Sequence, residues 1–409
     1  MFVELLKRSL LAPLLLCGLA AQAQTGPAGD AFYQAPSPLP AGAAGSVIWS
    51  RPLTGTMALA GAARNTLVLS LSTDPAGRPV AVSGTISMPA GVPPEGGWPV
   101  ITWTHGTTGI APICGPSRDT ASGPEHAYIT EIAALLDGFV RAGFAIVATD
   151  YQGLGAGGFH PFLQGVPNAR NALDMIRAAR ALEPGLGRRF GVLGHSQGGH
   201  AALFAAAQAP GHTPEFELMG SIAMAPGSQI AARLAAIMAS PRAELALPYL
   251  LYVLQSYATT YPEIDLSRIL TPQAISHLPD LRVQCMTHAL TTGYWASAIA
   301  KDQFLPNPAL APFLAIAARN EPGGLRITSP TLVMQGGADV TVRPQDTDLT
   351  VRQLCAASTP LAYQTFPGVD HGGVMASGAQ AARAWMAARF AGQPAAGNCA
   401  NLPVAASGG

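Results

Sequence analysis

The sequence has little charge and no excess of either sign. Asp, Glu, Lys and Arg make up only 11 % of its 409 residues, and 23 basic side chains are matched by 23 acidic ones. A nucleic-acid-binding protein needs a basic surface to neutralise phosphates, and a disordered chain carries more charge and less apolar surface. Hydrophobic residues reach 49 %. The composition therefore predicts a globular protein with a large core and no nucleic-acid partner.

The apolar stretch at the N-terminus is too short for a membrane helix, which requires roughly 20 residues. It runs from Leu10 to Ala20, follows Lys7 and Arg8, and precedes the small residues of Ala21–Ala23. This order is typical of a secretory signal peptide with its cleavage site. We therefore expect residues 1–23 to be removed and the mature chain to be periplasmic or extracellular, without a stable membrane span.

The sequence also lacks a CxxC motif and any local Cys/His cluster. No metal or other cofactor is therefore expected. Removal of the signal peptide leaves an even number of cysteines, and an exported chain favours disulfides over free thiols. The four residues are Cys114, Cys285, Cys355 and Cys399. Two disulfides are expected, and the sequence alone permits three pairings.

Short β-like runs alternate with helical stretches along most of the chain, which predicts a mostly parallel sheet with helices on both faces. The runs span 66–72, 80–88, 100–104, 144–149, 190–193, 220–225, 331–335 and 361–366. The helical stretches span 129–141, 168–182, 197–208, 345–356 and 379–390. Some runs are continuously apolar, as strands covered on both faces require. The first two runs, joined through Asp74–Gly77, predict a hairpin.

Residues 226–325 interrupt this alternation. They separate two core strands by about a hundred residues, where such connections are usually short, and they have an apolar helical character. We expect them to form a cap on a core of residues 46–225 and 326–393. An extended lead-in at 24–45 and a C-terminal tail at 394–409, which carries Cys399, complete the predicted organisation.

Ser196 lies at the centre of the pentapeptide Gly194–Gly198, which fits the pattern GxSxG. The pattern alone is common in a glycine-rich chain, but here it follows a predicted strand and opens a predicted helix. A strand, a sharp turn and a helix form the nucleophile elbow, which exposes a serine hydroxyl at the edge of the sheet. Ser196 is therefore the predicted nucleophile.

A serine nucleophile needs a histidine base and a carboxylate that orients it. Asp339 follows the run 331–335, and His371 follows the run 361–366, so both should lie at the same sheet edge as Ser196. The chain order serine, acid, histidine is that of α/β-hydrolases. Asp370 is the competing acid, but a residue adjacent to the histidine points away from its ring.

Acyl transfer also requires main-chain donors for the oxyanion of the tetrahedral intermediate. The amide of Gln197, directly after the serine, is the first expected donor. The second is expected from the loop that follows the run 100–104. We favour the Thr107 amide and keep the Gly106 amide as the alternative.

Several motifs together resemble the secretory lipase family of α/β-hydrolases, which includes the fungal lipase A type and bacterial relatives. They are Thr-Trp-Thr-His-Gly-Thr-Thr-Gly at 102–109 with Cys-Gly-Pro-Ser at 114–117, Asp-Tyr-Gln-Gly-Leu-Gly at 150–155, Gly-His-Ser-Gln-Gly-Gly-His at 194–200, and Gly-Gly-Ala-Asp at 336–339. The resemblance covers most of the mature chain and implies an exported carboxylic ester hydrolase with an α/β-hydrolase fold and a cap. It also implies that the cysteines pair in sequence order, Cys114 with Cys285 and Cys355 with Cys399. Gly115 departs from the Cys-Ala-Pro-Ser that the family commonly shows.

Two other functions compete with ester hydrolysis. Gly153, Gly155 and Gly158 fit the dinucleotide motif GxGxxG, which would indicate an oxidoreductase, but His160 and Pro161 separate these glycines from the next predicted helix. The same serine, acid and histidine could also cleave amides or peptides. The substrate, whether a small soluble ester, a lipid or a polyester, cannot be inferred from the sequence because it depends on the pocket.

Overall fold

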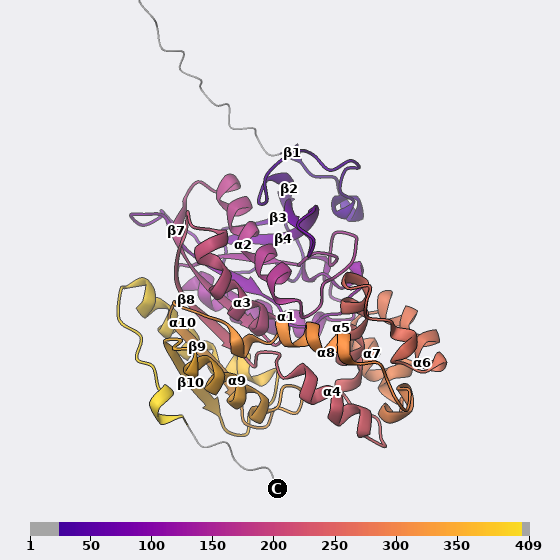
Figure 1. Cartoon of the computed structure of the whole chain (residues 1–409). Coiled ribbons are helices and arrows are strands. Elements are labelled where there is room, and N and C mark those ends of the chain that lie inside the picture. The colour runs from indigo at the N-terminus through magenta and orange to yellow at the C-terminus, as the bar shows by residue number, and fades with distance from the viewer. Residues whose placement is uncertain (1–23, 403–409) are drawn as a thin grey trace, which may run out of the picture.

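The computed structural model of the protein describes residues 24–402 (Figure 1). The predicted signal peptide at 1–23 and the tail residues 403–409 lie outside the described residues. Within residues 24–402, no helix is long and apolar enough to cross a bilayer.

A ten-stranded sheet forms the centre of the molecule, in the order β1-β2-β3-β4-β6-β5-β7-β8-β9-β10. The strands are β1 (Gln24–Thr25), β2 (Val47–Pro52), β3 (Arg64–Thr73), β4 (Pro79–Met88), β5 (Trp98–Thr104), β6 (Ala145–Thr149), β7 (Leu186–His195), β8 (Glu217–Met224), β9 (Thr331–Gly336) and β10 (Leu361–Phe366). The pairs β2–β3, β3–β4 and β4–β6 are antiparallel, and all the others are parallel. The expected hairpin is thus β3–β4, and the predicted α/β-hydrolase fold is confirmed.

Helices cover both faces of the sheet. On one face lie α1 (His126–Arg141) and α10 (Gly373–Phe390), and on the other lie α2 (Gly165–Leu182), α3 (Gln197–His212) and α9 (Pro344–Ala356). Three helices begin well before their predicted starts, α1 and α2 by three residues each and α10 by six. The glycines of α10 argue against a helix in the sequence, but Val374 and Met375 are buried and hold its first turn against the core.

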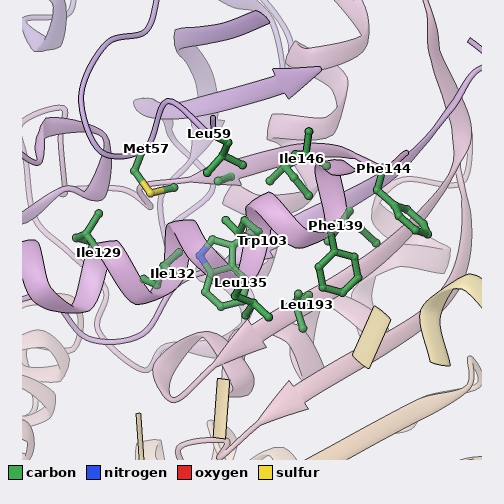
Figure 2. Packing of buried hydrophobic residues seen from close by; sticks show 14 of the residues in the cluster. Met57, Leu59, Trp103, Ile129, Ile132, Leu135, Phe139, Phe144, Ile146 and Leu193 are labelled. Carbon is green, nitrogen blue, oxygen red and sulfur yellow. The ribbon is translucent and has the colours of Figure 1, made fainter. Parts of the chain in front are cut away.

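Large side chains of α1 pack directly onto the central strands (Figure 2). Ile132, Leu135 and Phe139 repeat at helical spacing and are at most 3 % exposed. They belong to the same apolar cluster as Trp103 of β5 and Leu193 of β7. Burial of each such side chain contributes about 1.5–3 kcal/mol. This packing fixes the C-terminal ends of β5 and β7, where the oxyanion loop and the serine follow.

The lead-in at 24–45 is not simply extended, and this part of the prediction is wrong. Its first residues form β1, which pairs with β2, and Gly29–Tyr33 forms a 3-10 helix. Phe32 is fully buried, and its carbonyl oxygen accepts a hydrogen bond from Trp49 Nε1 at 2.9 Å. Burial of this aromatic side chain stabilises the folded segment more than the local sequence favours an extended chain.

The segment between β8 and β9 is helical, with α4 (Ile230–Ala239), α5 (Ala246–Thr260), α6 (Pro272–His277), α7 (Met286–Thr291), α8 (Ala311–Arg319) and several 3-10 turns. These inserted helices lie together at one side of the sheet (Figure 1). They have an apolar core of their own around Tyr252, Tyr257, Trp295 and Phe313. A disulfide joins Cys285, just before α7, to Cys114 in the core. The insertion is therefore a cap covalently tied to the hydrolase core.

The second disulfide joins Cys355 at the end of α9 to Cys399 in the C-terminal tail. Both pairs are those that the resemblance implies. In the tail, Asn398 receives a hydrogen bond from the Tyr363 amide and donates one to the Tyr363 carbonyl oxygen. The described part of the tail is thus fixed along β10.

Candidate active site

Ser196 sits in a sharp turn between β7 and α3. Its backbone has φ 58° and ψ −120°, a conformation that a serine rarely adopts, and its amide donates to the Met224 carbonyl oxygen at 2.9 Å. The Ser196 carbonyl oxygen in turn accepts from the amides of His200 and Gly227. The turn is held from β8 and from the first turn of α3, as a nucleophile elbow requires.

The two glycines of the pentapeptide are sterically necessary. A Cβ atom on Gly194 would lie 2.1 Å from the Gly198 carbonyl oxygen, and one on Gly198 would lie 1.8 Å from the Thr104 carbonyl oxygen. Both obstacles are main-chain atoms and cannot move aside. The GxSxG pattern is therefore a packing requirement of the turn.

Asp339 and His371 are hydrogen-bonded to each other, with 2.7 Å between Asp339 Oδ2 and His371 Nδ1. The other carboxyl oxygen of Asp339 accepts from the amides of Thr341 and Val342 at 2.8 and 2.9 Å. Burial acts to raise the pKa of Asp339, but the hydrogen bond and charge of His371, together with these donors, hold it below its ordinary value. Asp339 is therefore an ionised acceptor that keeps a proton on Nδ1 of the ring.

The loops that carry these two residues are joined by their main chains. The Ala338 amide donates to the Val369 carbonyl oxygen, and the Gly337 amide donates to that of Phe366. Asp370, the competing acid, is exposed and accepts from the Gly373 amide at the start of α10. Among the hydrogen bonds of residues 24–402, none joins Asp370 to the His371 ring.

Ser196 and His371 line one cavity of about 180 Å³, together with Thr107, Glu125 and Tyr249. We call it the histidine cavity. No hydrogen bond joins the Ser196 hydroxyl to His371 within the described part of the chain. Catalytic hydrogen bonds are often long without substrate and shorten in the complex.

Ser196 also borders a second cavity, of about 90 Å³, which we call the apolar cavity. Its walls include Leu163, Ile230, Ile237, Leu250 and Val253, mostly from the inserted helices. Its polar edge holds Arg233 and Asp346, whose side chains approach to 3.5 Å. Thr107, Ser196 and Tyr249 line both cavities. The two spaces therefore meet at the serine.

The two candidate oxyanion donors of the β5 loop differ in their partners. The Gly106 amide donates to the Tyr128 hydroxyl at 3.1 Å, whereas Thr107 lines both cavities at Ser196. A Cβ atom on Gly106 would lie 2.1 Å from that same hydroxyl. Gln197, the other candidate, is the first residue of α3, where helix amides have no partner within the helix. This arrangement favours Thr107 over Gly106.

A hydrogen-bonded chain connects the oxyanion loop to His371. His195 Nε2 lies 2.9 Å from the His371 carbonyl oxygen, so this nitrogen must carry the proton. His195 Nδ1 is then an acceptor, and the Tyr128 hydroxyl donates to it at 2.8 Å while accepting from Gly106. Burial and the nearby charge of His371 lower the pKa of His195 to about 3. His195 is therefore a neutral link in the structure and does not compete as a base.

The glycine-rich loop that follows β6 does not present a helix N-terminus to a ligand. Its last motif glycine, Gly158, is seven positions before the start of α2 at Gly165. A Cβ atom on Gly153 would overlap main-chain atoms of Phe159, and one on Gly155 would overlap the Ser83 hydroxyl and the Asp150 carboxyl. These glycines serve close packing of the chain on itself, which removes the structural basis for a dinucleotide site.

Two residues of the histidine cavity, Glu125 and Tyr128, were not among the residues predicted from the sequence. They lie about seventy positions before Ser196, and no motif surrounds them. Glu125 precedes α1 directly, but glutamate is not a typical N-cap residue and so gives little indication of a helix start. Their place in the site depends on how α1 packs, which the local sequence does not encode.

The fold defines a class of protein, an α/β-hydrolase, in which Ser196 and the Asp339–His371 pair lie at the same sheet edge. The sequence matches the secretory lipase family over residues 127–398, about two thirds of the 409 residues. The chain belongs to this family and is a hydrolase of the lipase and esterase type.

Solved structures of two enzymes are similar to the protein. Candida antarctica lipase A matches with a TM-score of 0.76 and 18 % identity, covering 91 % of this chain and 88 % of that one. The rice cell wall degrading esterase LipA from Xanthomonas oryzae matches with a TM-score of 0.67 and 21 % identity, covering 85 % and 98 %. No curated protein sequence matches the chain significantly. At these identities the structural similarity supports the fold.

Proposed function

We propose that the protein is an exported carboxylic ester hydrolase in which Ser196 is the nucleophile, His371 the general base and acid, and Asp339 the residue that orients the histidine. The observation that carries this proposal is the hydrogen-bonded Asp339–His371 pair, whose histidine lines the same cavity as a serine in a strained turn. The predicted signal peptide and the two disulfides support export.

The proton route follows from the hydrogen bonds of His371. Because Nδ1 donates to Asp339, Nε2 is the nitrogen free to accept the Ser196 proton as Oγ attacks the ester carbonyl carbon. The amides of Gln197 and Thr107 would stabilise the resulting oxyanion. His371 then protonates the leaving alkoxide, and a water molecule, activated in the same way, releases the acid from Ser196.

The two cavities suggest which part of the ester lies where. The leaving alcohol must receive its proton from His371, so we assign it to the histidine cavity, which that residue lines. The acyl chain then occupies the apolar cavity, where Leu250 and Val253 can replace its contact with water. Because the apolar cavity is small and ends at Arg233 and Asp346, short and medium acyl chains fit it best. This assignment favours a carboxylesterase over a lipase that acts on long-chain triglycerides.

Hydrolysis of p-nitrophenyl esters from acetate to palmitate, with an emulsified triglyceride, tests the reaction and the chain length. An organophosphonate that labels Ser196, identified by peptide mapping, tests the nucleophile. We expect turnover of the shorter esters and loss of both turnover and labelling in Ser196→Ala. A matched butyrate ester and butyranilide distinguish ester from amide cleavage. Labelling at another residue, or undiminished activity of Ser196→Ala, would refute the proposed function.

A further inference from the structure

The histidine cavity contains one carboxyl group that the proposed mechanism does not use. Glu125 lines the cavity beside Ser196 and His371 and is only 7 % exposed. One of its oxygens accepts a hydrogen bond from the Thr287 amide of α7 at 2.7 Å. The carboxyl thus connects the first turn of α1 to the cap, and it does so at the place where the leaving alcohol is expected.

The charge of Glu125 has no cationic partner. Within residues 24–402, no lysine, arginine or histidine forms an ion pair with it, and the neighbouring charged group, Asp119, is also acidic. Burial, and to a lesser extent Asp119, raise the pKa of Glu125 above its ordinary value. A buried carboxylate without a counter-charge is costly unless a ligand supplies one.

Two aromatic rings share the cavity with this carboxyl. Tyr128 and Tyr249 both line it, and Met286 and Leu290 complete the apolar part of the wall. Burial raises the pKa of both tyrosines, and the negative charge of Glu125 raises both further. Aromatic rings bind ammonium groups, and a carboxylate beside them adds a charge of the opposite sign.

We propose that the histidine cavity selects esters whose alcohol carries a positively charged nitrogen, and that Glu125 is the residue that determines this specificity. This inference rests on the proposed function, because it takes the histidine cavity as the alcohol site. The carboxylate attracts the cation, and the tyrosine rings contact the groups around the nitrogen. A neutral alcohol of the same shape leaves the Glu125 charge unpaired.

The substrate pair that tests this is butyrylcholine and 3,3-dimethylbutyl butyrate, which have the same shape and differ in charge. Assays at mildly alkaline pH keep Glu125 ionised. We expect the wild-type kcat/KM to favour the choline ester on the order of tenfold, within the range of a desolvated cation–π contact. Equal values, or a preference for the neutral ester, would overturn the inference.

Glu125→Gln removes the charge and keeps an oxygen that can accept from the Thr287 amide. We expect it to abolish the preference for the choline ester, so that the ratio of the two kcat/KM values approaches one. Glu131→Gln is the matched control, because Glu131 lies on α1, which Glu125 directly precedes, and is near Gly372 but exposed outside this cavity. Its ratio should equal that of the wild type. A preserved ratio in Glu125→Gln would exclude Glu125 as the determinant.

Inhibition measurements make the test independent of choline ester turnover and of the folding of a variant. Choline and 3,3-dimethylbutanol are compared as inhibitors of p-nitrophenyl butyrate hydrolysis by the wild type, and choline should bind on the order of tenfold more tightly. If choline binds no better than the neutral alcohol, the inference fails while the ester hydrolase stands. If p-nitrophenyl butyrate is not hydrolysed at all, the proposed function itself fails.

Discussion

The sheet edge and the inserted helices contribute to the site in different ways. Ser196, Asp339 and His371 each follow a strand of the core and are fixed by main-chain hydrogen bonds around them. The inserted helices contribute Leu250, Val253 and Met286 to the cavity walls, and all of these contacts are apolar side-chain surface. In the proposed function, catalysis therefore depends on groups held by the backbone of the core, whereas acyl-chain selectivity depends on side chains of the inserted helices that can change without altering the fold.

Substitutions of Ser196 and His371 in the core should cause the greatest loss of activity. Ser196→Ala should lower kcat/KM at least a thousandfold for every ester, independent of chain length, because it removes the bond-forming atom. His371→Ala should cause a similar loss. The double variant should be no worse than either single one, since residues that act as a unit are not additive.

Circular dichroism should show that both variants are folded, because neither side chain supports the sheet. If the two losses multiplied in the double variant, Ser196 and His371 would act in separate steps. A loss that depended on acyl chain length would place Ser196 among the specificity residues. Either result would contradict the assignment of catalysis to the core and of acyl-chain selectivity to the inserted helices.

The placement of Ser196, Asp339 and His371 at one sheet edge could be predicted from sequence because each follows a regular pattern. A strand followed by a turn fixes Ser196, and the glycines of that turn are required by main-chain contacts at about 2 Å. The cavity walls could not be predicted in this way. Leu250 and Leu251 are both buried leucines of α5, yet only Leu250 lines the apolar cavity, because the packing of α5 on α4 and the core decides which side faces the serine.

The same limit explains why Tyr128 was missed. Its hydroxyl matters because α1 places it between the Gly106 amide and His195, two groups that are distant in sequence. In contrast, the sequence did indicate that Asp370 should not pair with the histidine ring. Local geometry can thus be inferred from sequence, and contacts between distant segments require the fold.

Only one of the two disulfides joins the core to the inserted helices. Cys114–Cys285 links the core to the inserted helices across 171 positions, and Cys355–Cys399 links α9 to the tail across 44. Loop-closure entropy predicts stabilisation of roughly 5 and 4 kcal/mol, as upper values. Replacing each pair with serines and measuring unfolding in denaturant should give losses in that order.

Only the loss of Cys114–Cys285 should also change ester hydrolysis, because Cys285 precedes α7 and the Met286 amide donates to the Thr108 carbonyl oxygen beside Thr107. The Cys355 and Cys399 variant serves as the control and should retain wild-type kinetic constants at a temperature where it is folded. Identical kinetic effects from both pairs would show that the connection between core and cap has no special role in the site.

A substitution in α5 tests the inserted helices alone. Leu250→Phe fills part of the apolar cavity and should raise the ratio of acetate to octanoate ester hydrolysis more than tenfold while acetate is hydrolysed nearly as before. Leu251→Phe is the control, because the same side chain is added one residue later, away from the cavity. It should lower the melting temperature by overpacking and leave the ratio unchanged. Equal losses on both esters in Leu250→Phe would mean that α5 only supports folding.

A modest decrease in kcat is expected when the hydrogen bonds of the Tyr128 hydroxyl, which no sequence motif indicates, are removed. Tyr128→Phe deletes the hydroxyl that accepts from the Gly106 amide and donates to His195 Nδ1. Two hydrogen bonds of the chain that runs from Gly106 through His195 to His371 are lost, so Thr107 and His371 should be less well positioned relative to Ser196. One or two such bonds correspond to roughly a threefold to tenfold decrease in kcat, with KM little changed.

Tyr363→Phe is the control. It deletes a hydroxyl that donates to Asp348 at 2.6 Å, outside both cavities, and should lower stability without changing kcat. If both variants lowered kcat equally, or if Tyr128→Phe raised only KM, the hydrogen-bonded chain through His195 would not position Thr107 and His371 relative to Ser196.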